Sequence, residues 1–449
     1  MSWPATLPRA ADAAAGAAAR HWRLGLGLLV LARLAVPVLV LAFHGHKVPA
    51  LPRWDYVAQT GDATGFYAAS REFISAWGQL PHLLVALLAL ATLAAAVPLI
   101  RAWVKQPRRR AWLLVAAALG ASLLACIGIA RMHAPGAAVI GWSLLWALPM
   151  LPARALGQLT PDVAFGLGLA LSLAANAVGI VATAVAGARL TCSRGVGLLA
   201  GACVAAWPLL AEPIAGRGAW ENGQWLVDTG LHLYTEPLST ALVATACALL
   251  LAERVGPLAL AGSGVLLGYA TTVKLSNGLL AAAAVVLVAW RAGLRPGASS
   301  PAAREAARTT LPLVAGALAL MPVVAVYWQL GYVQVFDNPQ SWPTRPFSVE
   351  NIVPAWRDSL LFQPHTLVVI VPLAAIGCWA LRRRGWPLAL VAAWLAVNPL
   401  FYSFFRNLPQ HPRFLYASLP ALWLLTAAGA AWLATGTWQL ARQRRRSAS

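Results

Sequence analysis

Long apolar runs separated by short polar stretches extend along the whole chain. A helix needs about 17–25 apolar residues to cross the hydrocarbon core of a bilayer, so these runs predict twelve transmembrane helices. A further apolar piece at 137–151 is short, and we expect it to be re-entrant or interfacial because a full crossing there would break the alternation of basic loops. The predicted spans lie near 25–43, 81–100, 111–130, 161–187, 195–211, 237–252, 257–272, 278–290, 309–330, 362–381, 386–405 and 414–435.

The composition supports a membrane protein. Of the 449 residues, 60% are hydrophobic and 11% are charged, which excludes an ordinary soluble domain, a disordered chain and a disulfide scaffold. The five cysteines are far apart and have no C-x-x-C spacing, so they indicate neither a zinc site nor a disulfide framework. The first run follows an arginine-containing stretch and is long enough to span, which predicts an uncleaved signal anchor. We therefore expect an all-α polytopic membrane protein, with 1–449 as a single integral membrane domain.

The charge balance is strongly basic, with 34 Lys and Arg against 14 Asp and Glu. In a soluble protein a net charge of +20 would suggest nucleic acid as a partner. With the predicted spans in place, 22 of the 34 basic residues fall on one side, 11 on the other, and Arg33 lies within the first span. The positive-inside rule makes the basic side cytoplasmic, with both termini on it, and we expect no nucleic-acid partner. The composition, rich in Ala, Arg and Gly, indicates a GC-rich bacterial genome and hence the cytoplasmic (inner) membrane of a bacterium.

Three outer segments, at 44–80, 212–236 and 331–361, are too long to be tight turns. They contain most of the acidic residues, many aromatics and several histidines, and such loops on a rigid bundle are usual places for functional sites. Few charged residues lie within the spans, which favours an enzyme at the outer rim over a transporter. The 21 Trp residues are expected mainly at the membrane interface.

The first outer segment contains two candidate general bases, Asp55 and Asp62. A carboxylate just outside the membrane, among aromatic residues, can accept a proton if partial burial moves its pKa towards the working pH. Asp62 precedes a predicted helical turn that includes Tyr67 and Arg71. The alternative interpretation makes Asp62 a helix N-cap surrounded by solvated charges.

The second candidate group crowds His232, Tyr234 and Glu236 at one membrane interface, an arrangement that suits recognition of sugar hydroxyls. The structural alternative is a helix start in which Thr235 caps the helix, Glu236 complements its dipole and Pro237 occupies the first turn.

The third candidate group is Lys274, Ser276 and Asn277, between two short apolar runs. A lysine at this depth suits a phosphate, whereas the structural alternative is a snorkelling lysine beside an Asn-Gly turn.

The fourth candidate group includes Arg406, His411 and Arg413 in a short outer loop that opposes the positive-inside bias. Cations retained there suggest an anionic ligand such as a lipid phosphate, although phospholipid headgroups alone would also satisfy them.

These four groups, in this order, resemble the multi-spanning glycosyltransferases of the GT-C fold. An acidic residue in the first outer loop, here Asp55 or Asp62, is the general mark of that superfamily. The stretches LYTEPL, KLSNG and HPRFLYASLP are similar to those of the family that adds the second mannose of GPI anchors and has bacterial relatives. The sequence departs from that family where Lys274 replaces an expected Arg and where the first loop has WDYVAQTGDATGFY in place of a compact Trp-Asp…Tyr pattern, which leaves open which Asp is the base.

The resemblance implies transfer of a mannose-like hexose, with inversion, from a polyprenyl-phosphate donor to a lipid or glycan acceptor on the extracytoplasmic face. Some members of the superfamily use a divalent metal, but the sequence has no convincing ligand cluster and we expect no cofactor. The alternative function is a transporter or flippase of lipid-linked glycans. The resemblance implies roles for nine residues: Asp62 or Asp55 as the base; Lys274, Arg413 and His411 at the phosphate; Glu236 and His232 at sugar hydroxyls; and Tyr67 and Asn277 in substrate binding.

Overall fold

A computed structural model of the chain describes its membrane-embedded helices and several of their connections. All regular secondary structure of the described residues is helical, and these residues contain no β-strand. The described residues are 21–44, 62–78, 106–132, 140–215, 233, 235–294, 300–329, 349–353, 366–404 and 412–447.

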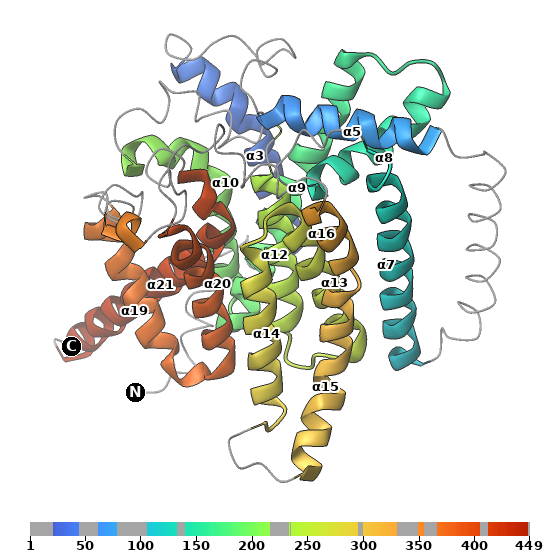
Figure 1. Ribbon diagram of the computed structural model, residues 1–449. Helices are drawn as coiled ribbons and strands as arrows, with labels where there is room; N and C mark the ends of the chain where they lie inside the picture. The colour runs from blue at the N-terminus through green and yellow to red at the C-terminus, as the bar shows by residue number, and fades with distance from the viewer. Residues whose placement is uncertain are drawn as a thin grey trace.

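The helices stand mostly upright and side by side, as Figure 1 shows. Two short elements, the π-helical η4 (Thr366–Ile370) and the 3₁₀-helical η6 (Pro412–Ser418), lead into two of them. The α-helices are α3 (Trp22–His44), α5 (Asp62–Gly78), α7 (Pro107–Ile129), α8 (Gly141–Ala155), α9 (Pro161–Thr191), α10 (Arg194–Ala215), α12 (Glu236–Leu250), α13 (Pro257–Val273), α14 (Asn277–Arg291), α15 (Ser300–Leu318), α16 (Met321–Tyr327), α19 (Val371–Leu381), α20 (Trp386–Tyr402) and α21 (Leu419–Ser447).

Four helical segments within the described residues are long and apolar enough to cross a membrane: Pro107–Ile129, Pro161–Thr191, Ser300–Tyr327 and Phe414–Thr435. The structure therefore supports a membrane-embedded helical protein. Helices also lie within the other predicted spans, except for 81–100, which lies outside the described residues. The total of twelve crossings stays a prediction.

Local sequence explains where several helices begin. Proline stands in the first turn of α7, α9, α12 and α13, where its missing N–H is not needed for an intrahelical hydrogen bond. At α9 the hydroxyl of Thr160 also accepts a hydrogen bond from the backbone N–H of Val163, at 3.3 Å. At the far end of α9, the Arg189 guanidinium donates to the Ala248 carbonyl near the end of α12. The start of α9 is thus set by Thr160 and a proline, and its end is joined to α12 by Arg189.

Small residues allow several helix pairs to approach closely. Gly264 and Gly268 of α13 lie against the backbone of α15, where an added Cβ would meet the carbonyls of Leu313 and Ala317. The same arrangement joins α19 to α21, with Gly377 against Leu425 and Gly429 against Leu373. Glycine and alanine are common at membrane helix contacts because association there depends on van der Waals packing of backbones.

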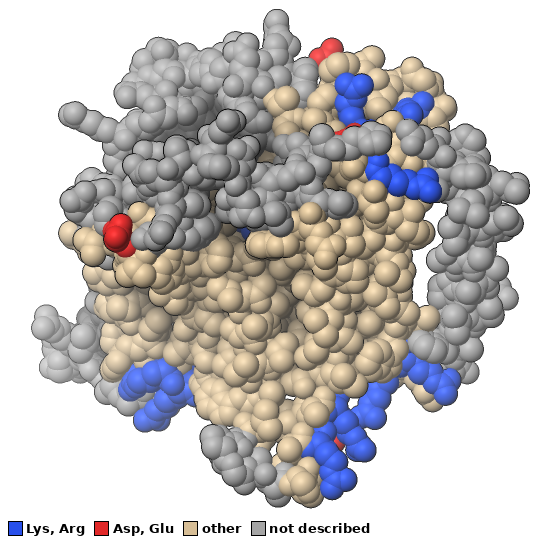
Figure 2. All heavy atoms as spheres, in the orientation of Figure 1, with Lys and Arg blue, Asp and Glu red and all other residues tan. Residues whose placement is uncertain are grey.

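On the face that Figure 2 shows, most of the exposed charged side chains lie towards the two ends of the described helices, and the surface between them is largely uncharged. Basic residues gather along the lower edge, where α7 and α15 begin and α19 ends. This end of the bundle is called the basic end below. The grouping agrees with the predicted clustering of basic loops, although which side of a membrane it faces stays a prediction.

Two helices close the opposite end. The helix α5 runs across the tops of the upright helices and packs on α7 and on the short α8 (Figure 1). The Ser70 and Ser143 hydroxyls join α5 to α8 through the carbonyls of Ser143 and Phe66, at 3.0 Å each. The start of α5 at Asp62 confirms the predicted helical turn, and the helix α8 coincides with the apolar piece that we expect to be re-entrant or interfacial.

Three tryptophans lie in the core of the bundle, whereas we expect most tryptophans at the membrane interface. Trp142, Trp146 and Trp394 are fully buried, and they are among the largest buried side chains of the described core. The indole N–H of Trp146 donates to the Ala164 carbonyl at 2.8 Å, and that of Trp394 donates to the Ala417 carbonyl at 2.6 Å. These three residues therefore do not lie at the interface, and for Trp146 and Trp394 the paired indole N–H makes the ring suitable for a core.

Candidate functional site

The helices α12, α13 and α14 are shorter than a bilayer crossing, with 15, 17 and 15 residues. At 1.5 Å per residue they are about 22–26 Å long, compared with about 30 Å for the hydrocarbon core. The link between α12 and α13 contains Glu253 and Arg254, and α14 ends at Arg291, so these three ends share one side of the bundle. The opposite ends, which begin at Glu236 and meet at Lys274 to Asn277, are therefore recessed within the bundle.

A tight turn joins α13 to α14. Lys274 leaves the helix in an extended conformation, with φ −149° and ψ 120°, and its carbonyl accepts from the Asn277 backbone N–H at 3.0 Å. The Gly278 N–H then donates to the Leu275 carbonyl at 2.9 Å. The extended residue ends the helical direction at Lys274, and the two hydrogen bonds start the next helix without a loop. The turn places the side chains of Lys274 and Asn277 against α12.

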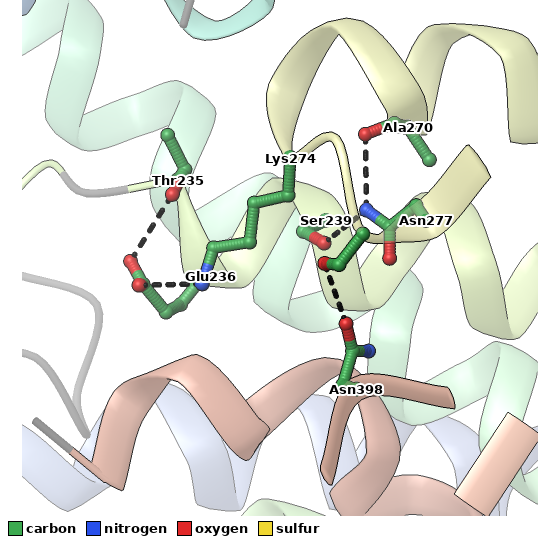
Figure 3. A network of polar contacts seen from close by, with 8 residues as sticks. Thr235, Glu236, Ser239, Ala270, Lys274, Asn277 and Asn398 are labelled. Atoms are coloured by element: carbon green, nitrogen blue, oxygen red, sulfur yellow. Dashed lines mark hydrogen bonds and ion pairs between the residues drawn. The ribbon is translucent and has the colours of Figure 1, made fainter. Parts of the chain in front are cut away.

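An ion pair between Lys274 and Glu236 lies at the centre of the site (Figure 3). The Lys274 Nζ is 2.8 Å from Glu236 Oε1, and the two side chains are 5% and 2% exposed. The same Nζ lies over the Phe414 ring, 5.1 Å from its centroid, so the charge also contacts an aromatic face. A snorkelling lysine would hold its ammonium in water. The snorkelling interpretation of Lys274 is therefore wrong.

The start of α12 differs in part from its predicted structure. Glu236 and Pro237 do occupy the first turn, but the Thr235 side chain makes no capping hydrogen bond. The Thr235 hydroxyl lies 3.5 Å from Glu236 Oε2 instead (Figure 3). The capping role expected of Thr235 is wrong because its backbone already has helical angles, with φ −74° and ψ −16°, whereas an N-cap is usually extended.

Asn277 continues the polar network next to the ion pair. Its amide Nδ2 donates to Ser239 Oγ and to the Ala270 carbonyl, both at 2.9 Å (Figure 3). Its Oδ1 is buried and has no hydrogen-bond partner among the described residues. Because an unpartnered buried oxygen is costly, this atom marks a place where a hydroxyl or water would be favourable.

A second branch of the network reaches α20. The Ser276 hydroxyl donates to Asn398 Oδ1 at 2.7 Å, and Asn398 Nδ2 is 3.4 Å from Ser418 Oγ. Ser418 in turn donates to the Trp394 carbonyl at 3.0 Å. Asn398 was not predicted as a site residue. The only signal in the sequence was one amide within the apolar run 386–405, which in a membrane helix indicates a buried partner.

The network joins segments that are far apart in the chain. Glu236 and Lys274 are separated by 38 positions, and Ser276 and Asn398 by 122. Phe414, which contacts Lys274, belongs to η6, and η6 packs against α12 and α20. Of the predicted residues, the structure thus brings together Glu236, Lys274 and Asn277.

The other predicted residues fall elsewhere or outside the described parts. Tyr67 lies on α5, buried, with its ring 5.8 Å from that of Trp146 and with the Arg71 guanidinium above it at 5.7 Å. Asp62 is the first residue of α5, but its side chain lies outside the described residues. The same holds for the side chain of Arg413, in η6, and for the whole of Asp55, His232 and His411.

Buried polar residues also occur in the middle of helices, where the sequence led us to expect few. Arg33 of α3 is 6% exposed, and its Nη2 donates to Asn176 Oδ1 of α9 at 3.1 Å. Asn176 was not predicted, although it too is an amide within a long apolar run. Among the described residues there is no group of three or more His, Cys, Asp or Glu placed to hold a metal ion.

In comparisons with known proteins, the chain matches no protein-family model and none of the curated proteins.

Proposed function

We propose that this protein is a membrane glycosyltransferase of the GT-C type, which moves a hexose from a polyprenyl-phosphate donor to a lipid or glycan acceptor. The observation that supports the proposal most is the meeting of three motif stretches. LYTEPL contributes Glu236, KLSNG contributes Lys274, and HPRFLYASLP contributes Phe414, all within one buried contact group. A purely structural origin of these stretches would not require them to meet.

The geometry favours a positioning role for Lys274. Its ammonium is neutralised by Glu236 at 2.8 Å, so it is less suited to hold a phosphate by itself. We assign Lys274 to keep Glu236 ionised and oriented, and Glu236 to accept hydrogen bonds from sugar hydroxyls. Asn277 of the same turn is held in place by its hydrogen bonds to Ser239 and to the Ala270 carbonyl. Lys274 is therefore proposed to position Glu236 and not to bind the phosphate, whereas Glu236 keeps its proposed role at sugar hydroxyls.

The chemical step needs a base and a leaving group. The acceptor hydroxyl attacks the anomeric carbon and its proton passes to a carboxylate, Asp62 or Asp55, while the C–O bond to the lipid phosphate breaks. The polyprenyl phosphate leaves with the negative charge, and the anomeric configuration inverts. The first-ranked base, Asp62, begins the helix α5 that crosses the end of the bundle away from the basic end.

The proposed orientation places the basic end in the cytoplasm and the α5 end outside the cytoplasmic membrane of a bacterium. The crowding of Arg and Lys at one end of the helices supports it (Figure 2). The donor and acceptor then reach the site from the outer leaflet, and the partners are membrane lipids rather than nucleic acid.

The test is sugar transfer by the purified chain in nanodiscs, with a panel of polyprenyl-phosphate sugars and lipid acceptors. We expect transfer with at least one donor, and loss of turnover by two orders of magnitude or more for Asp62→Asn. Retention of full turnover in Asp62→Asn with loss in Asp55→Asn would reverse the assignment of the base. Absence of both transfer and donor hydrolysis across the panel would refute the enzyme.

The second candidate function is a flippase of lipid-linked glycans. The observation that favours it is the pair of Arg33 and Asn176 in the middle of two helices, because polar residues at that depth often mark transport pathways. Movement of a fluorescent glycolipid between leaflets of proteoliposomes, without any transfer or hydrolysis, would support the flippase and contradict the transferase.

A further inference from the structure

An exposed face of α15 changes from arginine to leucine along its length. Its members are Arg304, Arg308, Leu311 and Leu318, and the two leucines are 49% and 59% exposed. At about 100° per residue, these four positions fall within a sector of about 80° around the helix. The face is therefore cationic near the start of the helix, at the basic end, and apolar above it.

The spacing of this face matches one leaflet of a bilayer. At 1.5 Å per residue, Leu311 and Leu318 lie about 4.5 Å and about 15 Å above Arg308. Half of the hydrocarbon core of a bilayer is also about 15 Å thick. With Arg308 at the level of the headgroups, the two leucines lie beside acyl chains, and Arg304 lies about 6 Å farther out.

The arginines of this face have charges that a ligand can use. The Arg304 Nε donates to the Ser300 carbonyl at 3.3 Å, which is a contact within its own helix. Within the described residues, neither Arg304 nor Arg308 forms an ion pair. Glu305 follows Arg304 but is turned by about 100°, which places it outside the sector of the face. A guanidinium presents a flat fork of N–H donors that matches phosphate oxygens.

The neighbouring helix α7 adds positive charge at the same height. Figure 2 shows basic side chains gathered where α7 and α15 begin. Leu114 of α7 and Leu313 of α15 lie beside glycines of α13 that are two residues apart. Counted back at 1.5 Å per residue, Arg110 lies about 6 Å below Leu114, and Arg308 lies about 7.5 Å below Leu313. The starts of the two helices therefore form one basic surface, which favours a headgroup with net negative charge over a zwitterionic one.

We infer that the exposed face of α15 binds an anionic phospholipid, with its phosphate between Arg304 and Arg308 and its acyl chains along Leu311 and Leu318. The site lies at the basic end, opposite the recessed candidate site, so the lipid bound here is not the substrate of the proposed reaction. The inference is independent of the proposed function, and it holds whichever compartment the basic end faces.

The test places a fluorophore on the face itself. Ala315 is half-buried and lies between the two leucines within the same sector, so Ala315→Cys can carry a small label in the full chain without its five native cysteines. Phospholipids with brominated acyl chains quench such a label when they lie beside it. In phosphatidylcholine vesicles, we expect brominated phosphatidylglycerol to quench at a mole fraction about 25-fold lower than brominated phosphatidylcholine, or about fivefold for each arginine.

Two substitutions and a matched control locate the site. Arg304→Gln and Arg308→Gln should each reduce the preference for phosphatidylglycerol about fivefold, and the double variant should bind the two lipids equally. The control is Arg383→Gln, which removes an exposed arginine at the end of α19, far from α15 in Figure 1, and should keep the wild-type preference. The comparison of the two lipids on the unsubstituted face decides the question even if an arginine variant fails to fold.

Three outcomes would overturn the inference. The first is equal quenching by the two brominated lipids on the unsubstituted face. The second is an equal loss of preference in Arg383→Gln and Arg308→Gln, because the attraction would then come from the overall charge of the basic end. The third is loss of the preference in inorganic phosphate but not in chloride of equal ionic strength, because the arginines would then bind free phosphate instead of lipid. The quenching does not depend on sugar transfer, so failure here and failure of the proposed function are distinguishable.

Discussion

The pair of Lys274 and Glu236 is an ionic contact that water does not reach. Two charges removed from water lose their hydration, and their attraction compensates for that loss only when both are present. The 2.8 Å contact between residues at 5% and 2% exposure has this character. The pair is therefore a sensitive point of the fold as well as of the proposed chemistry, and the two contributions can be separated by substitution.

Replacing one member of the pair should be more harmful than replacing both. We expect Lys274→Met and Glu236→Leu each to lower the free energy of unfolding by about 3–5 kcal/mol, because each leaves a buried charge without its partner. The double variant should recover most of that loss. The measurement is denaturant unfolding in micelles.

Sugar transfer by the same double variant separates structure from function. A stable but inactive protein is expected, because Glu236 is needed for the substrate. A double variant that transfers sugar at the wild-type rate would contradict the role of Glu236, and a loss below about 1 kcal/mol in each single variant would contradict the buried pair.

The candidate site shows which residues can be identified from sequence alone. Glu236, Lys274 and Asn277 stand in short polar stretches at helix ends, where a local pattern is visible. Asn176 and Asn398 are single amides in apolar runs, and nothing nearby in the sequence reveals their partners. Contacts across 38 or 122 positions depend on how helices pack, which no local pattern contains.

At the scale of helices, hydrophobic runs predict position well. The predicted span 257–272 corresponds to α13 at Pro257–Val273, because burial in a bilayer leaves a direct trace in hydropathy. Helix contacts are less visible. The approach of α19 and α21 depends on Gly377 and Gly429, which sequence inspection does not distinguish from the other glycines.

Alanine at Gly377 should destabilise the protein although alanine is the better helix former. Its Cβ would meet the Leu425 carbonyl, and overpacking of this kind costs about 1–3 kcal/mol. The matched control is Gly120→Ala on α7, where an added Cβ has no neighbour within 4 Å, and this variant should gain up to about 1 kcal/mol. The melting temperatures of the two variants should therefore move in opposite directions. A rise for both would show that α19 and α21 do not pack this closely.

At the scale of the whole molecule, the grouping of basic residues along the lower edge in Figure 2 predicts how the chain is oriented in a membrane. A bundle whose basic groups gather at one end has a preferred orientation, and the α5 and α8 end then faces the opposite compartment. The side on which each loop lies depends on this orientation and on the number of crossings.

Cysteine labelling tests that orientation. Ala155 at the end of α8 and Ser300 at the start of α15 are both exposed, at opposite ends of the bundle. In a background without the five native cysteines, Ala155→Cys should react with a membrane-impermeant maleimide added to intact cells, and Ser300→Cys should react only after permeabilisation. The reverse pattern would invert the topology and place the candidate site on the cytoplasmic side.

The short helices have a consequence for the lipids around them. α14 exposes Leu279, Val286 and Trp290, so its 15 residues meet acyl chains directly. A hydrophobic surface of about 22 Å beside a core of about 30 Å creates a mismatch that the bilayer relieves by thinning. In the proposed orientation, this thinning would draw headgroups of the outer leaflet towards the candidate site and shorten the path of the proposed lipid substrate. Transfer should accordingly be faster in vesicles of short-chain than of long-chain phosphatidylcholine, and an insensitive rate would mean that the bilayer keeps its thickness at this surface.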